Sequence, residues 1–535
     1  MTTALARTNG IALVGLAGIP VEVQTHIGPG IVGTTLVGLP DASLREAKER
    51  VRAALFSCGV PAVNRRVTVN LTPADLPKTG SGFDLAIAVS MLIARGLLPQ
   101  AVGDGGVFVA ELGLDGEVLP VPGVLPAAVA AAHNGLERIV VAPANAAEAR
   151  LPACVEVVPC RHLADLLYAF SEGSGLSLQG AWGAVAELAE LDGGQGGNAE
   201  DGLALPESAE GEDGVDLEEI KGQERAVHAL TVAAVGGHHL LLHGPPGGGK
   251  SMLARALPGL LPDLGDKDAQ VATALRSLAL GGERLTSLRS RPPLEMPHHS
   301  ATLISLIGGG NPIRPGVVSL AHTGVLLLDE APEFDQRTLD ALRQPIERGS
   351  VTVHRARSQV TFPARFQLVL TANPCPCGYG SGASEQNCRC SPHRKAQYRA
   401  RLSGPLLDRV DLQVHVDRPQ QFTFDGSGQA SSAVVSERVA QARARSAHRW
   451  RDTPWQTNGQ VPGRFLREHD TFSRSYSRGL ERFVERGIIS LRGADRILRM
   501  AWSCADLEGR SEPNTDDYTL AMELRGVTEG VPSWI

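Results

Sequence analysis

The sequence has no apolar run long enough to span a bilayer, and its N-terminus has no charged-then-apolar secretion signal. We therefore expect a cytoplasmic protein without a membrane partner. Hydrophobic residues make up 43% and charged residues 20% of the 535 residues, which is ordinary for a chain with packed cores. A chain of this length holds roughly two to four domains.

Positive charge is missing from one long stretch. Between Arg161 and Lys221 there is no lysine or arginine, against fourteen acidic residues, whereas from Arg389 to Arg451 twelve basic residues face five acidic ones. The net charge of −7 therefore hides a basic C-terminal half and does not exclude a nucleic-acid partner. Residues 171–214 are rich in Gly, Glu, Ala and Ser, which predicts an acidic, mostly disordered linker with room for a short helix near its start.

Cysteine is also scarce, because eight residues in a chain this long do not make a disulfide framework. Four of them nevertheless fall within sixteen positions, as two CxC pairs. Four thiolates could hold a structural Zn²⁺ in a closed tetrahedral site, and His393 could replace one sulfur. The alternative is four reduced thiols in a surface loop. The four residues are Cys375, Cys377, Cys388 and Cys390.

The most specific pattern is a glycine-rich stretch that follows the apolar run 240–242. It reads Gly-Pro-Pro-Gly-Gly-Gly-Lys-Ser and matches the phosphate-binding loop GxxxxGK[ST]. Glycines adopt positive φ easily, so this loop can turn successive N–H groups toward a polyphosphate. Lys250 would reach the β- and γ-phosphates of ATP, and the Ser251 hydroxyl would bind Mg²⁺. The predicted ATP-binding residues are Gly244, Pro245, Pro246, Gly247, Gly248, Gly249, Lys250 and Ser251.

Two later apolar runs end in polar residues that suit ATP hydrolysis. The run 324–328 leads into Asp329 and Glu330, as in a buried Walker B strand. Asp329 would orient a water on Mg²⁺, and Glu330 would polarise the attacking water. The run 366–372 ends at Asn373, whose amide could hold that water opposite the γ-phosphate.

Arginines farther along are candidates for contact with a phosphate. Arg409 is the first choice for an arginine finger that reaches the ATP of a neighbouring subunit, and Arg401 is the second. The alternative for Arg409 is an intrachain salt bridge to one of the flanking aspartates. Arg492 could contact the γ-phosphate from the C-terminal part, with Arg496 as its substitute.

The first third of the chain alternates short β-like runs with helical stretches, which predicts an α+β domain without a P-loop of its own. Two of its segments, Pro77–Asp84 and Glu111–Pro120, resemble the proteolytic domain of the Lon family, whose fold is ribosomal S5 domain 2-like. That family uses a Ser–Lys dyad.

The dyad itself does not align with this sequence. The serine position falls on Gly82 and the lysine position on Leu125. Ser81 and Lys78 lie close by, but neighbours on one loop need not meet as nucleophile and base. We therefore expect a Lon-like fold that has lost peptidase chemistry.

The whole series resembles the YifB/ComM family of Mg-chelatase-like AAA+ ATPases, from about residue 11 to residue 525. Supporting signatures are Met296–Ser300, Gly308–Pro312, Arg314–Gly316 and Ser319–His322. The resemblance implies an α/β chain that binds ATP and Mg²⁺ and forms a hexamer. For ComM members it implies an ATP-driven helicase that migrates branched DNA during natural transformation. The expected parts are a Lon-like domain (1–170), the acidic linker (171–214), a P-loop AAA+ αβα core (215–419) and a C-terminal helical lid domain (420–535).

One stretch of the core could contact DNA. Residues 349–362 alternate apolar and polar positions on either side of a basic tip, which predicts a β-hairpin. In a ring, such tips would line the pore and contact phosphates through His354, Arg355 and Arg357. The alternative is a hairpin whose arginines contact only water. The glycine-rich insert 303–316 could be a second loop facing the pore.

Two other functions stay open from the sequence. A protein-remodelling or magnesium-chelatase-like ATPase would use the same motor residues with a protein partner. A Lon-like protease or regulator would use the motor to feed the N-terminal domain, and the missing dyad residues argue against it.

Overall fold

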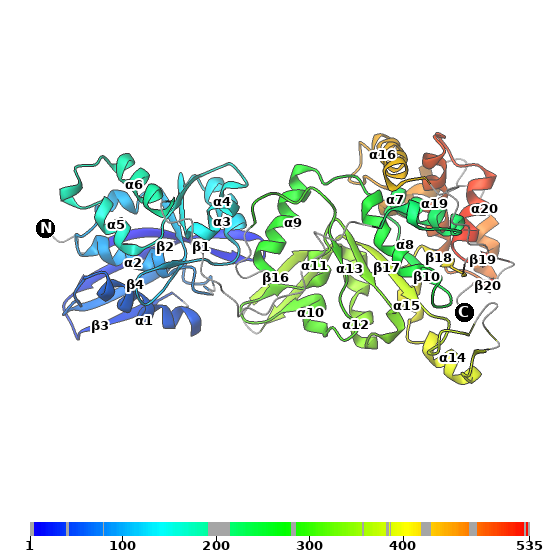
Figure 1. The fold of residues 1–535 in the computed structure, drawn as a ribbon, viewed down its shortest axis with the longest axis horizontal. Helices are drawn as coiled ribbons and strands as arrows, with labels where there is room; N and C mark the ends of the chain where they lie inside the picture. Colours follow the sequence, from blue (N-terminus) through cyan, green and yellow to red (C-terminus); the bar gives the residue numbers. More distant parts are fainter. Residues whose placement is uncertain are drawn as a thin grey trace.

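The computed structural model has an N-terminal part, a central part and a C-terminal part, which follow one another along its longest axis (Figure 1). It describes residues 5–38, 42–76, 78, 80–190, 215–279, 285–355, 358–380, 385, 387–418, 430–469, 479–528 and 531–532.

The N-terminal part is built on a seven-stranded mixed sheet. Its strand order is β3 (Gly33–Val37), β4 (Arg66–Thr72), β2 (Ala17–Gly28), β1 (Leu5–Val14), β5 (Gly106–Val109), β8 (Arg138–Val141) and β9 (Glu156–Pro159). β1 and β2 form a long antiparallel hairpin, and β5, β8 and β9 continue from β1 in parallel. This confirms the predicted mixture of strands and helices, while the likeness to the Lon proteolytic domain stays a prediction.

Helices cover this sheet, and their sequences explain how deeply they are buried. α2 (Asp84–Ala94) is apolar on every side, and all of its residues are buried. The first strand pair of the fold therefore packs directly against it. The other helices are α1 (Ala42–Ser57), α3 (Val124–His133), α4 (Pro143–Arg150) and α5 (Leu163–Ala169).

The predicted linker begins too early. Residues 178–190 form α6 (Leu178–Glu190), whose Trp182 is 1% exposed and lies against Phe108 and Phe170. The Arg138 guanidinium lies 4.8 Å from the centroid of the same indole ring. This buried aromatic anchor offsets the ordering entropy that the composition suggested would keep the segment unfolded. The N-terminal part therefore reaches residue 190, and residues 191–214 of the predicted linker lie outside the described residues.

The central part is a five-stranded sheet in which every neighbouring pair is parallel. Its order is β11 (Leu294–Glu295), β14 (Val325–Leu328), β17 (Gln367–Ala372), β10 (Leu240–His243) and β18 (Leu412–His415). Because the strands are parallel, all their last residues lie at one edge, here called the carboxyl edge, and all their first residues lie at the other, the amino edge.

Both faces of this sheet are buried, as expected for central strands made mostly of apolar residues. Leu240 and Leu242 belong to one hydrophobic core, whereas Leu241 points into a second core on the other face. α7 (Glu224–Gly236) and α8 (Lys250–Ala256) cover the first face, and α12 (Gln336–Ala341) and α13 (Arg343–Arg348) cover the second. The predicted αβα layering is therefore confirmed.

The C-terminal part is helical and completes the first of those cores. It contains α16 (Ser432–Arg449), α17 (Gly463–His469), α19 (Leu491–Leu507) and α20 (Thr515–Leu524). Ile497, Leu498 and Ala501 of α19 are buried in the same cluster as Leu240. The helices are thus packed onto the α/β layer, and their identity as a lid domain stays a prediction.

The N-terminal and central parts meet at a polar and an apolar contact. Ser277 of α9 (Asp266–Ala279) accepts a hydrogen bond from the Gly123 amide (3.0 Å) and also bonds to the buried Glu148 carboxylate. Beside them Val14 and Leu16, at the turn after β1, pack against Leu275, Val360 and Phe362. Figure 1 shows α9 and β16 (Ser358–Pro363) facing the N-terminal part. Among the described residues, no helix combines the length and apolarity needed to cross a membrane.

Candidate functional site

The glycine-rich loop connects β10 to α8 at the carboxyl edge of the sheet. Gly244, Gly247 and Gly249 have φ values of 153°, 79° and 85°, which L-residues with a side chain rarely adopt. A Cβ on Gly244 would also lie 2.1 Å from the Val416 carbonyl oxygen. Glycine is therefore required for the shape of the loop, as the motif predicts.

Lys250 lies inside this loop. Its ammonium donates to the carbonyl oxygens of Gly244 and Pro245, both at 2.9 Å, and to Oδ1 of Asn373 at 3.2 Å. Burial lowers the pKa of Lys250 below its usual value, while the nearby carboxylates of Asp329 and Glu330 oppose that change. The ammonium is thus held within the loop by neutral oxygens, and a phosphate group would replace weak partners with charged ones.

Ser251 and Asp329 supply oxygen atoms at one point. The Ser251 hydroxyl donates to Oδ1 and Oδ2 of Asp329, at 2.9 and 3.1 Å. Thr371 donates to the same carboxylate at 2.5 Å and accepts from the Glu330 amide at 2.8 Å. Mg²⁺ prefers a carboxylate and hydroxyl oxygens beside phosphate oxygens, so this donor set fits the ion that the sequence predicts.

Strand order explains how Asn373 reaches two motifs that are far apart in sequence. It follows β17, which lies between β10 and β14, so it stands between the loop and the Walker B carboxylates. Its Nδ2 donates to Oε1 of Glu330 at 3.3 Å. Glu330 itself has a φ of 52°, an uncommon conformation that holds its carboxylate at the end of β14. The structure brings Lys250, Ser251, Asp329, Glu330 and Asn373 together.

Three further residues at this edge make contacts that the sequence motifs did not indicate. Thr371 fixes both Walker B residues, and its position two residues before Asn373 was the available signal. Gln223 donates to the carbonyl oxygens of Gly248 and Asp417, at 2.9 and 2.6 Å, and Asp417 follows β18. Arg418 donates to the Pro246 carbonyl at 2.8 Å. The last two brace the loop from outside.

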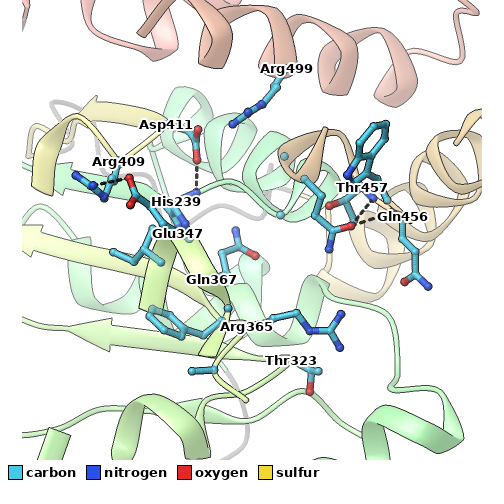
Figure 2. A pocket seen from close by; sticks show the side chains of 18 of the residues that line it. His239, Thr323, Glu347, Arg365, Gln367, Arg409, Asp411, Gln456, Thr457 and Arg499 are labelled. Carbon is cyan, nitrogen blue, oxygen red and sulfur yellow. Dashed lines mark hydrogen bonds and ion pairs between the residues drawn. The ribbon is translucent and has the colours of Figure 1, made fainter. Parts of the chain in front are cut away.

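The predicted arginine finger lies at the opposite edge of the sheet. Arg409 is 8% exposed, donates to the Pro405 carbonyl and forms an ion pair with Glu347 (Figure 2). Arg492 lies 3.6 Å from the same carboxylate and is 61% exposed. The two arginines that were predicted from separate motifs therefore meet on Glu347, a residue that no motif pointed to.

The other arginine candidates have different partners. Arg496 pairs with the buried Asp411, so the intrachain bridge considered for Arg409 belongs to Arg496 instead. Arg401 donates to the Pro332 carbonyl at 3.0 Å and lies 3.3 Å from the Glu333 carboxylate. These contacts anchor the end of α14 (Pro392–Arg399) to the segment after the Walker B strand.

A cavity of about 1010 Å³ opens at this amino edge. Arginines from α13, from the segments before β17 and β18, and from the C-terminal helices line it, and Figure 2 shows Arg499 directed into it from α19. Burial lowers the pKa of Arg499 to about 10, and the Asp411 carboxylate opposes that change. The arginines in the lining are Arg348, Arg365, Arg409, Arg443, Arg464, Arg467, Arg492, Arg496 and Arg499. Five acidic residues line the cavity as well, so this is a concave surface with an excess of positive charge.

Comparison with known proteins agrees with this geometry. Family models described as magnesium chelatase, subunit ChlI, as subunit ChlI of Mg-chelatase, and as the subunit ChlI C-terminal region match residues 216–423, 22–145 and 429–525. An uncharacterized protein of Mycobacterium tuberculosis is 42% identical over 525 residues, which cover 98% of this chain and 99% of the relative. Uncharacterized YifB of Escherichia coli is 37% identical over 507 residues (93% and 92%), and competence protein ComM of Haemophilus influenzae is 38% identical over 515 residues (95% and 95%).

The chain belongs to the YifB/ComM family. Together with the phosphate-binding loop and the Walker B carboxylates, this membership identifies residues 216–423 as a Mg-chelatase-like AAA+ domain that binds ATP. The resemblance seen in the sequence is thereby confirmed over nearly the whole chain.

This YifB/ComM chain also carries the predicted hairpin. β15 (Ser350–Arg355) and β16 pair antiparallel, and His354 and Arg355 are exposed beside the tip. Arg355 donates to the Gly310 carbonyl at 2.9 Å, so the hairpin touches the glycine-rich insert that contains β12 (Gly308–Gly309) and β13 (Arg314–Pro315). Arg357 lies outside the described residues, and DNA contact by these residues stays a prediction.

The four clustered cysteines converge in space. Their sulfurs lie within 4.8 Å of one another. Cys375 is buried and the other three are half-buried. The structure therefore brings together the predicted metal-ligand set, which lies between Asn373 and α14.

The residues near the Lon-like dyad positions have separate partners. Ser81 donates to the Glu111 carboxylate, and the Lys78 ammonium donates to the Pro73 carbonyl. Leu125 is buried in α3. The loss of peptidase chemistry stays a prediction, and these contacts agree with it.

Proposed function

We propose that this protein is an ATP-hydrolysing motor that moves branched or single-stranded DNA. It works as a ring of identical subunits, which we expect to be a hexamer, in recombination or natural transformation. Its relative from Haemophilus influenzae is named a competence protein.

The residues at the carboxyl edge divide the hydrolytic work. The loop amides and Lys250 bind the phosphates, and Ser251 with Asp329 holds Mg²⁺. Glu330 accepts a proton from the attacking water, and the amide of Asn373, 3.3 Å from Oε1 of Glu330, keeps that carboxylate oriented. Mg²⁺ neutralises charge on the transferring phosphoryl group.

The positions of the arginines support the proposed ring. Arg409 and the phosphate-binding loop of the same chain lie at opposite ends of four-residue strands. A strand rises about 3.3 Å per residue, so more than about 10 Å separates the two. Arg409 and Arg492 can therefore serve ATP only if it is bound by another subunit. A neighbour that presents its carboxyl edge to this cavity would place a γ-phosphate beside them.

The observation that supports DNA as the substrate is the contact between Arg355 and Gly310. It joins the basic hairpin and the glycine-rich insert into one exposed rim, and Arg314 of the insert is exposed as well. Arginines on a rim repeated around a ring would contact phosphates without reading base sequence.

The test measures ATP hydrolysis by the purified full-length protein with no DNA, with single-stranded DNA and with a Holliday junction. We expect DNA to raise the rate and ATP to drive unwinding of the junction, and Lys250→Ala to abolish both. ATP hydrolysis that responds to none of these DNAs would instead favour the protein-remodelling or chelatase-like function.

The hairpin gives a sharper version of this test. Arg355→Ala should weaken DNA binding and DNA-stimulated hydrolysis several-fold while leaving the rate without DNA unchanged. Each lost phosphate contact should also reduce the slope of log affinity against log salt by about 0.9. The matched control is Arg52→Ala, an arginine on the N-terminal part that is 71% exposed. If the two variants bind DNA with the same affinity, the hairpin does not contact DNA.

A further inference from the structure

We propose that Cys375, Cys377, Cys388 and Cys390 bind one structural zinc ion, and that this ion fixes the chain after the Asn373 strand against the phosphate-binding loop. The site uses no ATP and no DNA, so it stands or fails independently of the motor function.

The distances between the sulfurs carry the proposal. Cys375 lies 3.3 Å from Cys377 and 3.8 Å from Cys388, and Cys377 lies 3.6 Å from Cys388. Four sulfurs placed about 2.3 Å from one Zn²⁺ in a tetrahedron lie roughly 3.8 Å apart. A disulfide needs about 2.05 Å, so these are free thiols spaced for a shared ion.

The chemistry of the donors selects the metal. Four thiolates are soft ligands, which favour zinc or an iron–sulfur centre and disfavour Mg²⁺ and Ca²⁺. Four protein ligands fill a tetrahedral zinc site, so no position is left for a substrate or a water. The role is therefore structural.

Two cations lie near such a site. A zinc ion with four thiolates carries a net charge of about −2. Lys395 of α14 lies 3.5 Å from the Gly380 carbonyl and 3.1 Å from the Glu385 carboxylate, and Arg399 donates to the Pro374 carbonyl at 3.4 Å. Two cations of α14 thus border the segment that carries the first CxC pair.

Contacts of the same segment show what the ion would hold in place. A Cβ on Gly378 would lie 2.9 Å from Pro246 of the phosphate-binding loop, and one on Gly380 would lie 2.8 Å from the Cys375 sulfur. The chain therefore passes directly from Asn373 to the cysteines and back against the loop. With the second CxC pair tied to the first, residues 374–380 are clamped between that loop and α14.

Metal content is the direct test. Full-length protein purified without chelator should contain one zinc per chain by inductively coupled plasma mass spectrometry. The double variant Cys388→Ser/Cys390→Ser should contain less than a tenth of that, and Cys154→Ser, an exposed cysteine outside the cluster, should match the unmodified protein. Iron with visible absorbance would overturn zinc in favour of an iron–sulfur centre. No metal, even after reconstitution with Zn²⁺ under reducing conditions, would overturn the site.

A second measurement tests the clamp itself and does not depend on a variant that folds. Zinc is removed from the unmodified protein with an organomercurial and a chelator, the thiols are then restored, and the affinity for a fluorescent ATP analogue is measured before and after zinc is returned. We expect removal to weaken nucleotide binding several-fold and zinc addition to restore it. Unchanged affinity with the zinc gone would overturn the link to the phosphate-binding loop. Zinc present in a protein that ignores DNA would leave the site standing and refute only the DNA motor.

Discussion

The two edges of the five-stranded sheet differ in which partners hold their polar residues. At the carboxyl edge the Gly244–Ser251 loop, Asp329, Glu330 and Asn373 are joined by hydrogen bonds within one chain. At the amino edge Arg409 and Arg492 share the Glu347 carboxylate beside a large open cavity. The first edge gathers the phosphate-binding loop and its polar partners, whereas the second gathers arginines whose partners are carboxylates of the same chain.

This difference agrees with the proposed ring, in which the catalytic unit includes a second copy of the chain. Solvent partly screens the ion pairs of Arg409 and Arg492 with Glu347, because that carboxylate is 47% exposed. These arginines would gain far more from a phosphate at a subunit interface that excludes water. The amino edge is therefore interpreted as half of a site that a second copy completes.

The largest effect is expected from the amino edge. Arg409→Ala should lower ATP hydrolysis by about 10³-fold, because an arginine finger stabilises charge that develops only in the transition state. Binding of ATP to the same chain should change little. Measuring both quantities on one preparation decides the matter, and a variant that loses ATP binding along with hydrolysis would show that the two edges are not separate. A thermal unfolding curve checks that loss of the Glu347 pair has not unfolded the protein.

The next effect belongs to the carboxyl edge. Glu330→Gln should lower hydrolysis by at least about 10²-fold, since the amide cannot accept the proton of the attacking water. The shape of Gln retains the hydrogen bond from Asn373, so ATP should still bind and should hold the ring together. Native mass spectrometry with ATP measures that assembly. A Glu330→Gln protein that hydrolyses ATP at the normal rate would remove this carboxylate from the mechanism.

The smallest effect is expected at Glu347, which competes with phosphate for both arginines. In Glu347→Gln the amide can still accept a hydrogen bond but no longer carries charge. An ion pair this exposed is worth about 1 kcal/mol at most, so ATP hydrolysis should rise by no more than about fivefold. Glu508→Gln removes a comparable exposed partner of Arg438 far from this edge and should have no effect. A large fall in Glu347→Gln would mean that this carboxylate holds the arginines in their working position.

The carboxyl edge was readable from the sequence because its chemistry is local. The phosphate-binding loop is one contiguous motif, and Asp329, Glu330 and Asn373 each follow a strand whose apolar residues identify it. Parallel strands bring such residues to one edge in any arrangement. The bond between Thr371 and Asp329 could not be read, because it depends on β17 lying beside β14.

The amino edge could not be read in the same way. Glu347, Arg409 and Arg492 come from three separate segments, and nothing in their spacing predicts a shared carboxylate. The packing of α6 was hidden for a related reason: the acidic composition of residues 171–214 predicts disorder with room for a short helix, whereas buried Trp182 and Val185 hold that helix to the N-terminal part. Composition averages over a segment, whereas one large aromatic contact decides whether that segment folds.

Complementation between two inactive variants most directly tests whether ATP bound by one subunit is contacted by Arg409 of the next. Lys250→Ala lacks a working cradle but keeps its arginines, and Arg409→Ala keeps its cradle but lacks the finger. The two variants are mixed by co-refolding or subunit exchange, and two different affinity tags verify that mixed rings form. The mixed rings should regain a clear fraction of ATP hydrolysis, because an intact phosphate-binding loop then meets an intact Arg409 at some of the interfaces. Mixed rings that form and stay as inactive as either variant alone would contradict the account.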